Sequence, residues 1–265
     1  MTPFTYQPDK LLVIAGPCQI ESLEHALMIA KELKAIASKL PIQLVYKSSF
    51  DKANRTSVTG ARGTGIDAVL AILNQVRETY ELPLLTDVHS TEQAYAAGAV
   101  VDILQIPAFL CRQTDLLIAA GNTGKTINVK KGQFLHPEDM RFVAEKIAST
   151  GNQKIFLCER GTCHGYRDLV VDMRSLLIMR ASGYPVIFDA THSVQSMGGN
   201  GGSSGGSREY VRPLLRAAAA VGIDGVFIEC HEDPKRAPSD GASMLPLSEL
   251  EATLKEVLAI RASLS

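Results

Sequence analysis

The chain has 265 residues and a formal net charge of −1, and 46% of its residues are hydrophobic. This hydrophobic content excludes global disorder, and the balanced charge argues against a general binder of nucleic acid or other polyanions. No apolar run approaches the ~20 residues of a membrane helix, and residues 1–10 lack the basic start and apolar stretch of a secretory signal. Five cysteines, none at a CxxC spacing, favour free thiols in a reducing cytoplasm.

Short apolar segments alternate with longer segments of helical composition along the chain. The short segments are apolar along most of their length, which is typical of parallel strands that are buried on both faces. The predicted strands are 11–16, 44–48, 83–87, 102–106, 127–130, 155–159, 185–189 and 225–229. The predicted helices are 23–40, 65–80, 92–98, 113–121, 137–150, 169–183, 210–221 and 246–263.

Eight strands that alternate with eight helices predict an α/β protein with a (β/α)8 TIM barrel, as a single catalytic domain over residues 1–265. A doubly wound open sheet is the alternative, but the GxGxxG turn typical of that fold is missing after the first strand. The glycine- and serine-rich segment 196–207 follows the seventh strand. It could be a flexible linker, but at the catalytic end of a barrel we predict a mobile active-site loop.

Basic residues gather after the predicted strands, where a barrel carries its chemistry. Guanidinium and ammonium groups bind phosphate and carboxylate oxygens, so this end is predicted to bind small anions. Lys47 and Lys130 are the most informative, because each ends an apolar strand, where a cation is costly without a partner. Ordinary solvated surface would explain any one of the others, which are Lys52, Arg55, Arg62, Arg112, Lys131, Arg160 and Arg167.

Four potential metal ligands, Cys18, His192, Glu229 and Asp240, follow the first, seventh and eighth predicted strands. In a closed barrel the eighth strand pairs with the first, so these segments would be neighbours. A thiolate, an imidazole and two carboxylates suit divalent Zn, Fe, Mn or Co better than Mg or Ca. The residues alone leave two interpretations open: a metal site, or a core cysteine beside unrelated polar residues.

Other thiols and imidazoles have simpler interpretations. Cys158 lies inside a predicted strand and is expected to fill the core. Cys230 should point to the opposite face of its strand from Glu229. His25 and His136 are expected on a helix surface or at a helix cap.

The chain resembles the 3-deoxy-D-manno-octulosonate 8-phosphate synthases from about Leu11 to the last helix. The resemblance is carried by residues 14–18 with Glu21-Ser22, 47–55, 105–113, 128–133 and 189–195. The most specific phrase is Lys-Ala-Asn-Arg at 52–55, where the related heptulosonate synthases have Lys-Pro-Arg-Thr. The resemblance implies a barrel transferase that condenses phosphoenolpyruvate with D-arabinose 5-phosphate and water. The products would be the octulosonate phosphate, which feeds lipopolysaccharide synthesis, and inorganic phosphate.

The resemblance also implies roles for individual residues. The four potential ligands named above match the metal-dependent branch, which implies one divalent metal ion. Arg112 would reach the sugar phosphate of a neighbouring subunit, which implies a homo-oligomer, usually a tetramer. The implied catalytic residues are Lys52, Asn54, Asp87, His192 and Asp240. The implied substrate-binding residues are Lys47, Lys52, Asn54, Arg55, Thr56, Gln105, Arg112, Lys130, Gln133 and Arg160.

Three other functions stay open on the sequence alone. A heptulosonate synthase would use erythrose 4-phosphate as the acceptor. A Schiff-base aldolase would form a covalent intermediate on Lys130 or Lys47. A sugar-phosphate sensor on a barrel scaffold would bind without turnover, although it would not need the whole set of metal and anion residues.

Overall fold

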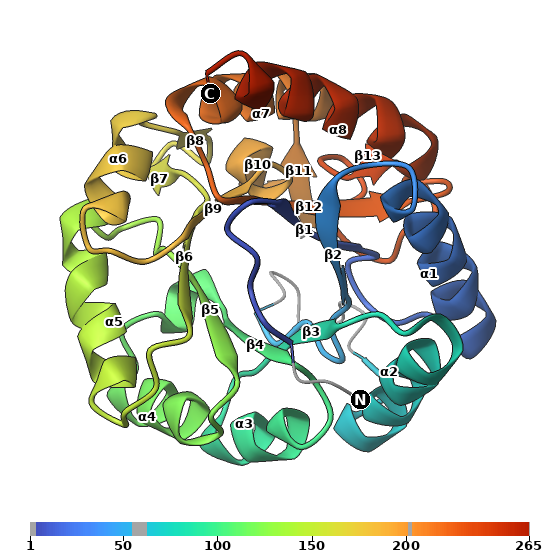
Figure 1. Cartoon of the computed structure of the whole chain (residues 1–265), viewed down its shortest axis with the longest axis horizontal. Coiled ribbons are helices and arrows are strands. Elements are labelled where there is room, and N and C mark those ends of the chain that lie inside the picture. The colour runs from blue at the N-terminus through green and yellow to red at the C-terminus, as the bar shows by residue number, and fades with distance from the viewer. Residues whose placement is uncertain (1–3, 55–62, 201–202, 265) are drawn as a thin grey trace.

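Eight parallel strands close into a ring at the centre of the molecule, which is a computed structural model that describes residues 4–54, 63–200 and 203–264 (Figure 1). The last strand of the ring pairs with the first, and Gly16 lies opposite Glu229. The predicted (β/α)8 barrel is therefore confirmed, and the open sheet is wrong. The ring contains β1 (Leu11–Gly16), β2 (Ile42–Lys47), β3 (Leu84–Asp87), β4 (Ile103–Ile106), β5 (Thr126–Lys130), β6 (Ile155–Glu159), β9 (Val186–Asp189) and β12 (Gly225–His231).

Helices form a layer around this ring (Figure 1). Two begin where a serine caps free backbone N–H groups: Ser22 accepts from the His25 amide, and Ser90 forms a capping box with Gln93. No helix within the described ranges is long and apolar enough to cross a membrane. The helices are α1 (Leu23–Ala37), α2 (Ile66–Tyr80), α3 (Thr91–Gly98), α4 (Thr114–Asn122), α5 (Met140–Ala148), α6 (Arg174–Arg180), α7 (Val211–Val221) and α8 (Leu247–Ala262).

The predicted helix over 169–183 is wrong in its first turn. Residues Leu169–Val170 form β8, which pairs antiparallel with β7 (Thr162–Cys163). Leu169 lies against Gly161, whose φ of 92° turns the chain back toward it. This local pairing takes the backbone hydrogen bonds that a longer helix would have used, so α6 begins only at Arg174.

The glycine-rich segment forms a hairpin rather than an extended connection. Strands β10 (Gln195–Asn200) and β11 (Ser203–Gly206) pair antiparallel, and their pairing begins at Gln195 opposite Gly206. The hairpin follows η3 (His192–Val194) after the carboxyl end of β9. The mobility expected for this segment stays a prediction.

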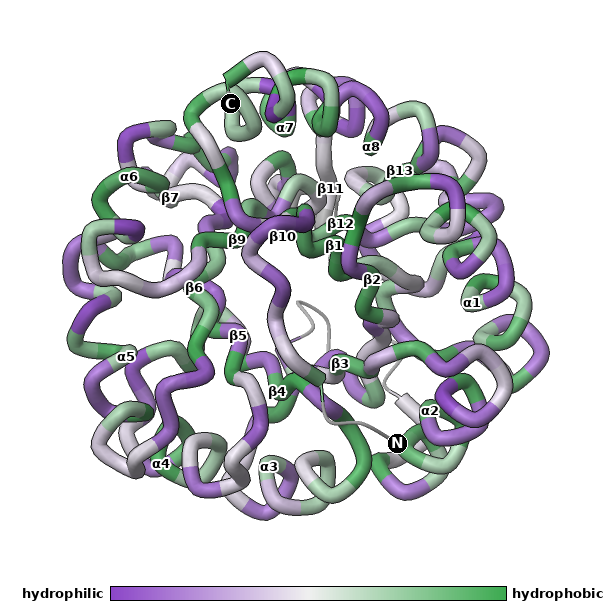
Figure 2. Tube along the Cα trace, in the orientation of Figure 1, coloured by the Kyte–Doolittle hydropathy of each residue, from purple (hydrophilic) through white to green (hydrophobic). Residues whose placement is uncertain are grey.

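The hydrophobic core has two layers, one inside the ring and one between the ring and the helices. Hydrophobic residues are frequent along the strands of the ring (Figure 2). Strand alternation sends neighbouring residues to opposite layers. Cys158 lies in the inner layer and Cys230 in the outer layer, as expected. Phe4 and Tyr6 pack against the inner layer, and the Tyr6 ring meets that of Phe156 edge-on at 5.3 Å.

Candidate active site

A close approach between the first two strands positions the first loop of the site. A Cβ on Gly16 would lie 2.0 Å from the carbonyl oxygen of Lys47, so only glycine fits at the end of β1. The chain then crosses the end of β2, where the Nζ of Lys47 donates to the Cys18 carbonyl at 3.1 Å. This crossing brings the Cys18 loop over the carboxyl end of the barrel.

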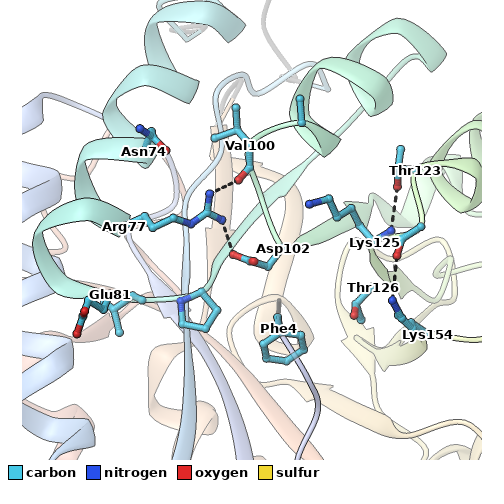
Figure 3. A pocket seen from close by; sticks show the side chains of 14 residues that line it. Phe4, Asn74, Arg77, Glu81, Val100, Asp102, Thr123, Lys125, Thr126 and Lys154 are labelled. Carbon is cyan, nitrogen blue, oxygen red and sulfur yellow. Dashed lines mark hydrogen bonds and ion pairs between the residues drawn. The ribbon is translucent and has the colours of Figure 1, made fainter. Parts of the chain in front are cut away.

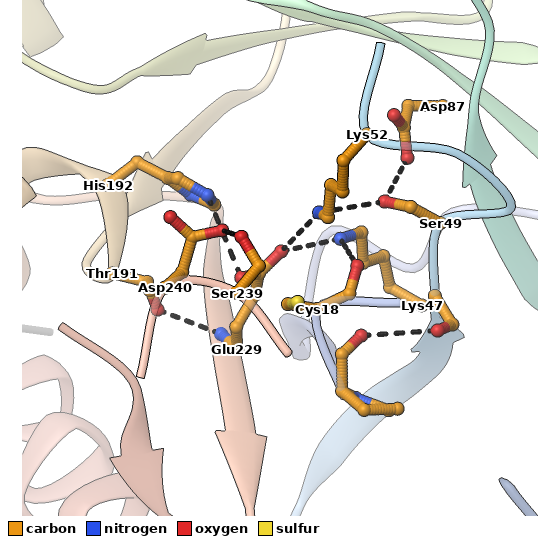
Figure 4. A network of polar contacts seen from close by, with 12 residues as sticks. Cys18, Lys47, Ser49, Lys52, Asp87, Thr191, His192, Glu229, Ser239 and Asp240 are labelled. Carbon is orange, nitrogen blue, oxygen red and sulfur yellow. Dashed lines mark hydrogen bonds and ion pairs between the residues drawn. The ribbon is translucent and has the colours of Figure 1, made fainter. Parts of the chain in front are cut away.

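Lys47 and Glu229 form a buried ion pair between the carboxyl ends of β2 and β12 (Figure 4). The Nζ of Lys47 lies 2.5 Å from Glu229 Oε1, and the Nζ of Lys52 lies 3.8 Å from the same oxygen. Burial alone would raise the pKa of Glu229, but the charges of Lys47 and Lys52 outweigh it and lower the pKa to about 2. The expectation that Lys47 needs a partner is confirmed.

Lys130 has a second buried carboxylate as its partner. Its Nζ lies 2.5 Å from Asp189 Oδ2 and 3.6 Å from the centre of the Phe227 ring. Asp189 also approaches the Nδ1 of His192 at 2.8 Å and accepts the His192 backbone N–H at 2.9 Å. Burial alone would raise the pKa of Asp189, but His192 and Lys130 hold it below its usual range. The carboxylate therefore fixes both the lysine and the imidazole.

The four predicted metal ligands converge at this end of the barrel. Ligand atoms of Cys18, Glu229 and Asp240 all lie within 4.8 Å of one another. With its Nδ1 turned to Asp189, His192 faces Glu229 Oε2 with its Nε2, at 3.7 Å. Asp240 has a left-handed backbone with φ of 57°, a conformation that is uncommon for a residue with a side chain.

The chemistry of this cluster fits a divalent transition-metal ion. Glu229 Oε2 is buried, and no group in the described part of the chain hydrogen-bonds to it. A buried carboxylate oxygen is costly to leave unsatisfied, and a cation would satisfy it. Burial raises the pKa of the Cys18 thiol to about 12, so the sulfur keeps its proton unless a further positive charge stabilises the thiolate.

Arg160 and Gln195 connect this cluster to the hairpin. The Nη2 of Arg160 donates to the His192 carbonyl and to Gln195 Oε1, both at 3.0 Å. Gln195 in turn donates from Nε2 to Asp240 Oδ1 at 2.6 Å. The Nε of Arg160 is buried, and no acceptor among the described residues binds it. A guanidinium with an unused donor is suited to an anionic ligand.

Asp87 anchors the opposite side of the site through Ser49 and His89. Ser49 donates to Asp87 Oδ1 at 2.5 Å and accepts from the Nζ of Lys52 at 3.1 Å. His89 Nε2 lies 3.1 Å from Asp87 Oδ2. Burial alone would raise the pKa of Asp87, but the contacts with His89 and the charge of Lys47 hold it below its usual range.

The remaining predicted residues fall into three groups. Gln105 and Gln133 are buried, and Gln105 accepts a hydrogen bond from Asn128 at 3.2 Å. Arg112 and Asn54 are exposed at the surface of this chain. Arg55, Thr56 and Arg62 lie outside the described residues.

Two expectations about single residues are wrong. Lys131 was expected among the anion-binding cations, but its Nζ turns away to Glu159 Oε1 at 3.5 Å and to nearby backbone carbonyls. The cause is strand alternation, which sends Lys131 to the opposite face from Lys130. His25 does not lie on an open helix surface: its side chain is only 11% exposed and packs against His231. His136 does cap a short helix, as expected, by accepting the Glu138 amide.

Three residues in contact with the site had no predicted role: Asp189, Gln195 and Ser49. Asp189 and Gln195 lie in the phrase 189–195 that carries the resemblance, so their position alone could have marked them. Their partners come from other strands, and the sequence does not show which side chains meet there.

A cavity of about 660 Å³ lies at the opposite, amino end of the strands (Figure 3). Arg77 and Asp102 in its wall pair with each other at 2.5 Å. Lys154 donates to the Gly124 carbonyl at 3.3 Å. None of the predicted site residues lines this cavity.

Comparisons with known proteins assign the chain to one family. The model of the DAHP synthetase I family matches residues 5–263. Curated relatives named 2-dehydro-3-deoxyphosphooctonate aldolase include one from Granulibacter bethesdensis, which is 61% identical over 93% of this chain and 87% of its own length. A second, from Rhizobium meliloti, is 58% identical over 97% of this chain and 91% of its own length. A third, from Rhodopseudomonas palustris, is 62% identical over 94% of this chain and 87% of its own length.

Proposed function

Because the chain belongs to the DAHP synthetase I family and matches 2-dehydro-3-deoxyphosphooctonate aldolases over nearly its whole length, we propose that it catalyses their reaction. It condenses phosphoenolpyruvate with D-arabinose 5-phosphate and water to give 3-deoxy-D-manno-octulosonate 8-phosphate and inorganic phosphate. One observation carries the assignment of the site. Arg160 Nε is a buried donor without an acceptor, and Glu229 Oε2 is a buried acceptor without a donor, within the described residues. An anionic substrate and a cation would satisfy them.

Lys130 and Arg160 are proposed to hold phosphoenolpyruvate, which carries a phosphate and a carboxylate. The ammonium group of Lys130 has three donors, and one of them is directed to Asp189 Oδ2, which also accepts from the Nδ1 of His192. The other donors of Lys130 and the Nε of Arg160 are suited to the substrate. Lys47 and Gln133 are proposed as further contacts, and Asn54, Arg55, Thr56 and Gln105 as contacts of the substrates.

In the proposed reaction, C3 of phosphoenolpyruvate attacks the aldehyde carbon of the sugar and a C–C bond forms. Water adds to C2, the C2–O bond to phosphate then breaks, and phosphate leaves with the bridging oxygen. Lys52 is suited to stabilise the aldehyde oxygen as it gains charge and then a proton. Burial would lower the pKa of Lys52, but the negative charges of nearby carboxylates, that of Glu229 above all, outweigh it and raise the pKa, so Lys52 acts as a donor rather than a base.

We propose that Cys18, His192, Glu229 and Asp240 hold one divalent transition-metal ion. The unsatisfied Glu229 oxygen and the mixed sulfur, nitrogen and oxygen donor set support this proposal. The buried lysines here already face carboxylates, so a bound ion would also add the positive charge that two anionic substrates require. When bound, the ion would supply Lewis-acid polarisation of a substrate oxygen.

The first experiment is phosphate release from phosphoenolpyruvate with D-arabinose 5-phosphate, before chelation, after chelation and after Zn²⁺, Mn²⁺ or Fe²⁺ is restored. We expect activity to vanish on chelation and to return with metal. Cys18→Ala should lose metal and activity. The control variant Cys163→Ala, whose thiol lies on β7, should keep both.

Three outcomes would overturn parts of this assignment. Full activity after verified metal removal would contradict the metal's role. Turnover of erythrose 4-phosphate instead of the pentose would assign the heptulosonate reaction. A covalent adduct trapped by borohydride would indicate a Schiff base on Lys130 or Lys47.

We propose that the exposed Arg112 lies in a contact between copies of this chain, as part of a tetramer. Phe109, Phe134 and Phe142 are each about half exposed. Lys146, on the same helix as Phe142, donates to the Arg112 carbonyl, so these aromatic side chains and Arg112 share one region. Exposed aromatic residues beside an arginine are typical of interface cores. Light scattering should find an oligomer that Phe134→Glu weakens and Tyr95→Glu, on α3, does not. A monomeric wild type would contradict the proposal.

A cytoplasmic location is proposed as well. All five cysteines are free thiols in the structure, which is typical of a reducing compartment. Fractionation of cells that express the chain should find it with cytoplasmic markers, and recovery with secreted or periplasmic markers would contradict this.

A further inference from the structure

Two histidines and two glutamates gather next to the proposed metal site without taking part in it. Glu21 lies just before α1 and His25 in its first turn, while His231 ends β12 and Glu232 follows it. The Nε2 of His231 lies 2.9 Å from Glu21 Oε1, and its Nδ1 lies 3.2 Å from Glu232 Oε2. The rings of His25 and His231 lie against each other at a tilt of 35°, with their centres 4.9 Å apart. The side chain of His231 is only 3% exposed, so this side of the cluster is buried in the protein.

One nitrogen in this cluster has a lone pair with nothing to bind. The Nε2 of His25 faces Glu232 Oε2 at 3.0 Å, so this nitrogen carries the proton of a neutral ring. The Nδ1 of His25 is then an acceptor. It is buried, and no donor in the described part of the chain reaches it. Glu21 Oε1 lies 3.9 Å from the Nδ1 of His25.

We propose that Glu21, His25 and His231 form a second binding site for a divalent transition-metal ion such as Zn²⁺. One ligand atom from each of the three lies within 4.8 Å of the other two. Two imidazoles and one carboxylate are a frequent zinc ligand set, and three protein ligands leave the fourth position to water. Glu232 would accept the remaining ring proton of His25 from its Nε2, as carboxylates commonly do behind metal-bound histidines. The Nδ1 of His231 accepts the Asp233 backbone N–H at 2.9 Å, so an ion bound at the Nε2 of His231 would move the ring proton to Nδ1, toward Glu232.

The position of this site indicates what an ion there would do. Glu21 follows Cys18 in the same loop, and His231 follows Glu229 on the same strand. An ion shared by Glu21 and His231 would therefore join the two segments that supply ligands to the first site. It would stabilise their relative position without contacting the substrates of the proposed reaction.

Titration of the chelator-stripped full chain with Co²⁺, followed by absorption and by elemental analysis after gel filtration, tests the proposal. We expect two bound Co²⁺ ions per chain. One should give a thiolate-to-cobalt charge-transfer band, because Cys18 lies in the first site. The other should give only the weak bands of nitrogen and oxygen ligands.

Variants assign the second ion. His25→Gln should reduce the count of bound ions from two to one and leave the charge-transfer band intact. Glu21→Gln should do the same without changing the contact between the two imidazole rings. Glu232→Gln should weaken the second ion about 10- to 100-fold. His136→Gln, which alters a capping histidine elsewhere, should still bind two ions.

A count of one with the charge-transfer band in the wild type would overturn the proposal, as would a count of two in both His25→Gln and Glu21→Gln. The first result would mean that His25 and His231 only pack and form hydrogen bonds in this cluster. Loss of the charge-transfer band alone would instead contradict the first metal site, so the two failures are distinguishable. Circular dichroism confirms that each variant is folded before its ions are counted.

Discussion

The two ends of the barrel both contain charged side chains, but they use them differently. At the amino end, a cavity of about 660 Å³ is lined by Arg77 and Asp102, which pair with each other in its wall. At the carboxyl end, the pairs are more deeply buried, and Glu229 Oε2 and Arg160 Nε are left without hydrogen bonds among the described residues. The volume of a cavity therefore says less about function here than the unsatisfied buried atoms do.

The largest difference in activity is expected between two variants that each replace one carboxylate by an amide, one at each end of the barrel. Glu229→Gln removes a proposed metal ligand and the charge partner of Lys47. We expect activity to fall at least about 100-fold and the free energy of unfolding to fall by about 3–5 kcal/mol. Phosphate release and urea denaturation measure the two effects.

Asp102→Asn is the matched exchange at the amino end. It weakens the pair with Arg77, and we expect a loss of about 1–3 kcal/mol in stability with activity within about twofold of the wild type. Equal losses of activity in the two variants would show that the ends do not differ in function.

A smaller effect is expected from the pH dependence of stability. Asp189 has a folded-state pKa below its unfolded value of about 3.9, so it stabilises the fold above that pH. The stabilisation is lost as the pH falls from about 4 toward the lower pKa of the folded state, because over this range the unfolded carboxylate takes up a proton and the folded one does not. Asp87 is expected to act in the same direction.

Asp189→Asn should therefore be less stable than the wild type at pH 7 but should lose less further stability between pH 5 and pH 3. Urea midpoints measured across this range check the slope. Parallel curves for the two proteins would show that Asp189 does not contribute to the acid sensitivity of the carboxyl end.

A more local effect is expected at Gln195, which links Arg160 to Asp240. Gln195→Leu keeps a side chain of similar size but breaks both hydrogen bonds. We expect metal affinity and kcat/KM to fall about 10- to 100-fold, with little change in stability. Ser196→Ala, one position along the hairpin, is the control. An unchanged kcat/KM in Gln195→Leu would show that the two groups are positioned independently.

The barrel itself was predictable from the sequence because its strands are buried on both faces. Each predicted strand lies within two residues of the observed one at its start and end, since a run such as Leu11–Gly16 leaves little choice of register. The need of Lys47 and Lys130 for buried partners was predictable for a similar reason: a cation at the end of an apolar strand must be compensated.

Which partners they find was not predictable. Glu229 and Asp189 come from strands distant in sequence, and only the closed ring shows that they face these lysines. The competition between helix and strand in segment 169–183 was not predictable either. This segment has helical composition, yet Leu169–Val170 pair with Thr162–Cys163. His25 was misjudged because its partner, His231, is at the far end of the chain.

The pairing of β1 with β12 has a consequence for how the protein folds. Cys18 and Glu229 lie near opposite ends of the chain and become neighbours only when the first and last strands meet. Contacts between such distant segments form late, because closing a long loop costs entropy before any contact repays it. An ion that binds both segments would therefore stabilise the closed barrel relative to partly folded forms and slow its unfolding more than it speeds its folding.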